Sequence, residues 1–160
     1  MAESRIRWRE IRRLGSDGIE DDEERFAKGR YFDAACPSYV NVRQLVRISG
    51  PPVGGVRQVD LVDPSNSSKM PAIGVVVEKS SPTQCLVQII GEVNGGLFSG
   101  LTPNGRYFVG ADAYIVFPPP APAPGGYMMV QIVCVAVAPS VLLVEPNFAM
   151  TRVVWSPISP

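Results

Sequence analysis

Histidine is absent from this 160-residue chain, and so are the motifs on which many active sites are built. The chain therefore lacks the usual general base, the side chain that titrates near neutral pH and the commonest metal ligand. It also has no Walker loop and no glycine-rich dinucleotide motif. We expect a protein that is not an enzyme and that carries no cofactor.

Few candidate catalytic residues remain, and most of them lie in predicted loops and turns. Ser68 and Lys69 are neighbours in a loop, and Lys79 precedes serines in a turn. Glu78 and Glu92 could meet across a hairpin as a pair of carboxylates. Loop polarity and surface charge are the simpler interpretations of both arrangements.

Cysteine is scarce, and the few cysteines lie far apart in the sequence. Cys36, Cys85 and Cys134 are the only three, and no two of them form a CxxC motif. An odd number fits a disulfide framework poorly, and a zinc site needs closer spacing. We expect buried free thiols, which suit a protein made in a reducing cytoplasm.

Net charge is also lacking, since 15 basic residues balance 15 acidic ones. A nucleic-acid-binding protein usually has a basic excess, so we expect no nucleic-acid partner. The uncharged stretch 127–144 contains Gln131 and is interrupted by Pro139 and Ser140. It is rich in valine and isoleucine, so two short strands joined by a turn explain it better than a membrane span.

The charges that are present gather at one end of the chain. Residues 1–30 contain 16 of them, whereas the other 130 residues contain 14. All 16 prolines lie from Pro37 onward. The sequence thus predicts a charged N-terminal arm, 1–30, and a charge-poor domain, 31–160.

The arm is basic over 5–13 and acidic over 17–24, with too few apolar residues to form a core. Its acidic spacing matches no calcium loop. Two interpretations stay open, a solvated tail and an arm that orders on a partner subunit. In the second, seven residues are the candidate contacts: Arg5, Arg7, Trp8, Arg9, Ile11, Arg12 and Arg13.

From residue 31 the chain alternates between short runs rich in β-formers and clusters of glycine, proline, serine and asparagine. No window shows a helical period. The nine expected strands are 40–49, 56–63, 72–79, 84–93, 106–109, 113–117, 128–138, 141–144 and 151–155. This pattern predicts an all-β fold, a compact barrel- or sandwich-like domain.

Several of these runs are apolar on both faces, as in 75–77 and 130–137. A small domain has difficulty burying both faces of many strands. We therefore expect other subunits to cover part of the surface.

Several short segments of the domain form a pattern over roughly residues 37–150. They are 69–76 (KMPAIGVV), 87–93 (VQIIGEV), 100–110 (GLTPNGRYFVG), 118–120, 125–127 with 130–131, and 142–147 (LLVEPN). In this order, the segments resemble capsid decoration (cement) proteins of tailed phages and similar β-domains of phage fibres. The family tends to have Asp-Gly where this chain has Asp112-Ala113, and the charged arm is not part of the shared pattern.

This resemblance implies a β-barrel-like structural protein on the outer surface of a virion, commonly a homotrimer that binds across major capsid protein subunits. A fibre, spike or baseplate segment of the same virus is the alternative. A glycan-binding module is a third hypothesis, and it would need exposed aromatic side chains, such as Tyr107, Tyr114 or Trp155, along a groove.

Overall fold

The computed structural model describes residues 29–157, and its larger compact unit begins at Tyr31. This domain is essentially all-β, which confirms the predicted fold class. The elements are β1 (Arg30–Ala35), β2 (Leu45–Val53), β3 (Val56–Leu61), the 3-10 turn η1 (Ser67–Lys69), β4 (Gly74–Ser81), β5 (Gln84–Val93), β6 (Arg106–Val109), β7 (Ile115–Val116), β8 (Tyr127–Val130), β9 (Ile132–Ala138), β10 (Val141–Val144) and β11 (Thr151–Val154).

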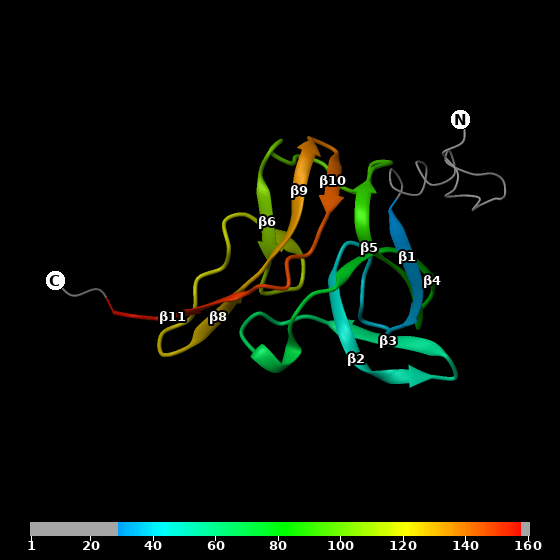
Figure 1. Ribbon diagram of the computed structural model, residues 1–160, viewed down its shortest axis with the longest axis horizontal. Helices are drawn as coiled ribbons and strands as arrows, with labels where there is room; N and C mark the ends of the chain where they lie inside the picture. The colour runs from blue at the N-terminus through cyan, green and yellow to red at the C-terminus, as the bar shows by residue number, and fades with distance from the viewer. Residues whose placement is uncertain (1–28, 158–160) are drawn as a thin grey trace, which may run out of the picture. The chain divides into compact units, whose positions relative to one another are not determined.

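Five strands close into a barrel in the order β1-β3-β2-β4-β5, with β5 returning to β1 (Figure 1). The β1–β3 pair is parallel, whereas β3–β2, β2–β4 and β4–β5 are antiparallel. A tight turn forms the β2–β3 hairpin, where Gly54 and Gly55 have φ values of 59° and 79°. Glycine adopts this left-handed conformation without the steric cost that a Cβ imposes.

Strand β5 belongs to the barrel and to a second group of strands. Its first half pairs with β4, and its last three residues pair with β10. Gly91, with a φ of 106°, lies where β5 changes partners. Beyond β10 the sheet continues through β9 and β6 to β7, and a separate two-stranded sheet joins β8 to β11.

Two apolar cores occupy the domain. One lies among the barrel strands and includes Val46 and Val76, and the other includes their neighbours Leu45 and Val75. All four side chains are fully buried. Because adjacent strand residues point to opposite faces, β2 and β4 separate the two cores. For these two residue pairs, burial on both faces of a strand is thus explained within one chain.

The uncharged stretch 127–144 forms β8, β9 and β10 rather than one continuous element. The expected strand 128–138 is broken at Gln131, which is fully buried. Its side-chain Oε1 accepts from the Ala72 N–H at 2.8 Å, and its Nε2 donates to the Ala72 carbonyl at 2.9 Å. Among residues 29–157, no helix is long and apolar enough to cross a membrane.

Candidate functional site

The seven predicted contact residues of the arm lie outside the described residues. They are Arg5, Arg7, Trp8, Arg9, Ile11, Arg12 and Arg13. Their role as contacts with a capsid therefore stays a prediction.

Strands β8 and β11 pair with each other and, together with Trp155, are called the C-terminal ribbon below (Figure 1). Every residue of β11 is exposed. Val154 is 62% exposed, and Val153 and Trp155 are 39% and 38% exposed. Arg152 is the only charged residue of the ribbon. Exposed large apolar side chains on a segment with so little charge are typical of a surface that another protein covers.

The base of the ribbon is anchored through β8. The Met129 N–H donates to the Pro64 carbonyl at 2.7 Å, and Met128 is buried. The Tyr127 hydroxyl accepts from the Ser67 N–H at 2.9 Å, and hydrogen bonding to Ser67 lowers the pKa of Tyr127. The Arg152 guanidinium lies 4.1 Å from the centre of the Tyr127 ring, a cation–π contact.

Strand β11 itself is held on one side only. It pairs with β8 over four residues, from Thr151 with Val130 to Val154 with Tyr127. In the part of the chain that the structure describes, no strand pairs with its other edge. Two-stranded sheets are marginal in water by themselves, and an open edge is a template for strand addition. The ribbon is therefore our candidate interaction surface.

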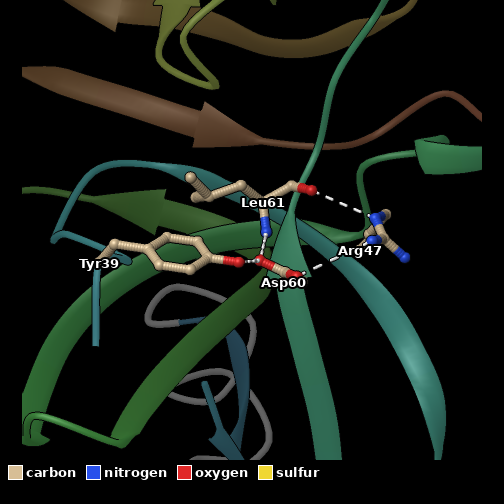
Figure 2. Close-up of polar contacts among 4 residues, drawn as sticks. All are labelled: Tyr39, Arg47, Asp60 and Leu61. Atoms are coloured by element: carbon tan, nitrogen blue, oxygen red, sulfur yellow. Dashed lines mark hydrogen bonds and ion pairs between the residues drawn. The ribbon is translucent and has the colours of Figure 1, made fainter. Parts of the chain in front are cut away.

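Apart from the ribbon, a network of polar contacts connects the 37–44 loop to the barrel (Figure 2). The Tyr39 hydroxyl donates to Asp60 Oδ1 at 2.8 Å, and the same oxygen accepts from the Leu61 N–H at 2.7 Å. Arg47 Nη2 lies 3.9 Å from Asp60 Oδ2, while its Nε donates to the Leu61 carbonyl at 3.2 Å.

This network has a structural explanation. The hydrogen bond to Asp60 is the main reason that the pKa of Tyr39 is raised, since it favours the protonated phenol. Both Asp60 oxygens face neighbours of their own chain, and the guanidinium of Arg47 bridges to the β3 backbone. The contacts fasten the loop to β2 and β3, and they include no nucleophile beside a base.

The catalytic candidates from the sequence are occupied by local contacts. The Ser68 hydroxyl donates to Asn66 Oδ1 at 2.7 Å, and Asn66 caps η1. The Lys79 ammonium donates to the carbonyls of Val40 and Pro82 at 2.8 and 2.9 Å, and a third carbonyl lies at 3.3 Å. Such a lysine holds loops together, because its three protons all face backbone oxygens.

Glu78 and Glu92 do line one open cavity of about 520 Å³, together with Tyr31. Among residues 29–157, no cluster of histidine, cysteine, aspartate or glutamate could hold a metal ion. The cavity wall includes none of the aromatic residues named for the glycan-binding hypothesis. The Tyr107 hydroxyl instead accepts from the Thr102 N–H at 2.9 Å, and Tyr114 lies beside Arg43.

No protein-family model matches the chain, and neither a curated protein nor a solved structure is significantly similar to it. Its function must be inferred from its own residues. The ribbon was within reach of sequence reasoning, because 151–155 contains three large apolar residues and one charge. What the sequence lacked was any sign that this strand would pair on one edge only.

Proposed function

We propose that this protein is a virion structural protein, a decoration protein that binds on the outer surface of a capsid across neighbouring major capsid protein subunits. The observation that carries the proposal is the exposed, nearly uncharged C-terminal ribbon on an all-β domain. The resemblance of residues 37–150 to phage decoration proteins supports the choice of partner.

The physical basis is interface area. Each square ångström of apolar surface removed from water contributes about 25 cal/mol before the costs of ordering are subtracted. A surface with few charges loses little by desolvation when it binds. A protein that adds such an interface across a joint between capsid subunits stabilises the joint.

Self-association, with a homotrimer as the expected state, is part of the same proposal. The two cores weaken one reason for it, because they bury both faces of the strands at Leu45-Val46 and at Val75-Val76 within one chain. The remaining reason is the ribbon, with its open edge and the exposed Val153, Val154 and Trp155.

Copy number in purified particles tests the proposal. The gel-band intensity of this chain should be close to that of the major capsid protein, because decoration sites repeat over the whole shell. A handful of copies per particle would instead favour the fibre, spike or baseplate alternative. Absence of the chain from purified particles would contradict both.

A binding experiment with the purified chain and separate capsids tests the same proposal independently. The purified chain should co-sediment with undecorated capsids and should raise the temperature at which they disrupt. Capsids already carrying their full decoration are the control and should take up none.

A further inference from the structure

A second cavity, of about 410 Å³, reaches the barrel where β1 meets β5. Its wall is formed by Ala35, Cys36, Pro37, Ser49, Gln58, Val59, Thr83 and Gln84. Cys36 is therefore at the wall of a cavity although only 6% of its surface is exposed. A small reagent that enters the cavity would meet a thiol.

Cys85 belongs to the same buried core as Cys36. The Cys36 N–H donates to the Thr83 carbonyl at 3.0 Å, two residues before Cys85 on the way into β5. Both cysteines point into the core among the barrel strands. Burial raises the pKa of the Cys85 thiol to about 12, and a side-chain hydrogen bond with Cys36 contributes to this rise. The two sulfurs are thus close neighbours.

We propose that Cys36 and Cys85 form a disulfide by exchange with a low-molecular-weight disulfide that enters this cavity. The Cys36 thiolate attacks one sulfur of the reagent, and the reagent's S–S bond breaks to release a first small thiol. The Cys85 thiolate then attacks the Cys36 sulfur of the mixed disulfide and displaces the second small thiol. The two protein thiols are oxidised by two electrons, the reagent is reduced by two, and the protons go to the departing thiols.

The third cysteine is the internal comparison. Cys134 is completely buried in the other core, and burial alone raises its pKa. It does not line the cavity beside Cys36. We expect Cys134 to keep its thiol under conditions that oxidise the pair.

The bond would join the end of β1 to β5, the strand that closes the barrel against β1. The parallel ladder of β1 with β3 has two residue pairs, Ala34 with Arg57 and Ala35 with Gln58. A Cys36–Cys85 bond closes a loop of about 50 residues, and cross-links across loops of this length restrict the unfolded chain strongly. A protein that folds in a reducing cytoplasm would thus be stabilised after release into an oxidising medium.

In the test, the full chain is incubated in its native state with 2-hydroxyethyl disulfide, then denatured, alkylated and weighed by mass spectrometry. We expect two of the three cysteines to escape alkylation, with the peptides of Cys36 and Cys85 linked and Cys134 alkylated. The oxidised protein should melt about 5 °C or more above the reduced protein. The reaction should also accelerate as the pH rises, because thiolates are the attacking species.

Variants separate the two steps. Cys85→Ala should stop at a mixed disulfide on Cys36, and Cys36→Ala should take up no reagent, whereas Cys134→Ala should form the internal bond as the parent does. Three alkylated cysteines in the parent protein would overturn the proposal, and so would a bond between two chains. Peptide mapping of the parent decides the question even if a variant fails to fold.

Discussion

At the scale of single residues, Gln131 shows how one buried amide can replace a stretch of strand pairing. Its two hydrogen bonds satisfy both backbone groups of Ala72. Gln131→Leu keeps the volume but leaves the N–H and C=O of Ala72 without these partners. We expect a loss of about 3 kcal/mol in the free energy of unfolding, measured with urea.

The matched control is Gln58→Leu. Gln58 is partly exposed and its side-chain Nε2 donates to the nearby Val56 carbonyl. Its replacement should change the free energy of unfolding by no more than about 0.5 kcal/mol. Equal losses in the two variants would show that burial of the Gln131 amide is not the cause.

Ala113 occupies a backbone conformation that suits glycine. Its φ is 70°, its N–H donates to the Gly110 carbonyl, and its carbonyl accepts from the Leu45 N–H at 2.7 Å. Glycine at this position would adopt the same φ without the steric cost of a Cβ. The sequence alone could not show that the alanine adopts a left-handed turn.

Ala113→Gly should therefore be tolerated although the side chain is buried. Relief of the left-handed strain is worth about 1–2 kcal/mol, and the lost methyl burial costs about 0.8 kcal/mol. We expect Ala113→Gly to raise the free energy of unfolding by between zero and about 1 kcal/mol. Ala111→Gly, in the same loop, should lower it by about 0.5 kcal/mol. Thermal melts of the two variants that ranked them in the opposite order would contradict this.

At the scale of elements, turn residues predicted the strands better than the apolar runs did. Gly54-Gly55 and the 80–83 segment mark hairpins that the structure contains. Strand β1, with the sequence RYFDAA, was missed because it lacks an alternating pattern. The break at Gln131 was missed because a single buried amide does not change the composition of a valine-rich run.

The C-terminal ribbon leads to a prediction about association. Val154→Lys places a charge on its most exposed apolar position, where desolvating the ammonium would oppose any interface. We expect sedimentation to show weaker self-association and the melting temperature of the dissociated chain to stay nearly the same. Val53→Lys, at the β2–β3 hairpin and 66% exposed, is the matched control and should associate as the parent does. Equal effects of both lysines would point to net charge rather than to the ribbon.

At the scale of the whole molecule, the two cores explain how consecutive apolar residues of one strand can both be buried. Leu45 and Val46 are consecutive and both fully buried, yet they belong to different cores. From the sequence, apolar runs such as 75–77 predicted surfaces covered by other subunits. Whether a second core in the same chain or a partner chain covers a strand depends on topology, above all on the β5–β10 pairing, and periodicity does not encode this pairing.

The charged arm supplies the last prediction. Strand β1 begins at Arg30, so deletion of residues 1–28 leaves every described strand intact. The arm has too few apolar residues for a core of its own, and we expect the melting temperature to stay nearly unchanged. Binding to undecorated capsids should fall sharply, because Trp8 and the nearby arginines are residue types that dominate interfaces.

Two further measurements separate the effect of the arm's charge from the effect of its length. One varies the salt concentration, and the other uses variants that keep the full length of the arm. Exposed ion pairs are screened over about 10 Å at 0.1 M salt, so attachment of the full chain should weaken as salt rises. Replacing five arginines by glutamine should remove most of that salt dependence. The five are Arg5, Arg7, Arg9, Arg12 and Arg13. Trp8→Ala should weaken binding but leave its salt dependence unchanged. If the chain without residues 1–28 binds capsids as tightly as the full chain does, the arm is a solvated tail and attachment belongs to the domain alone.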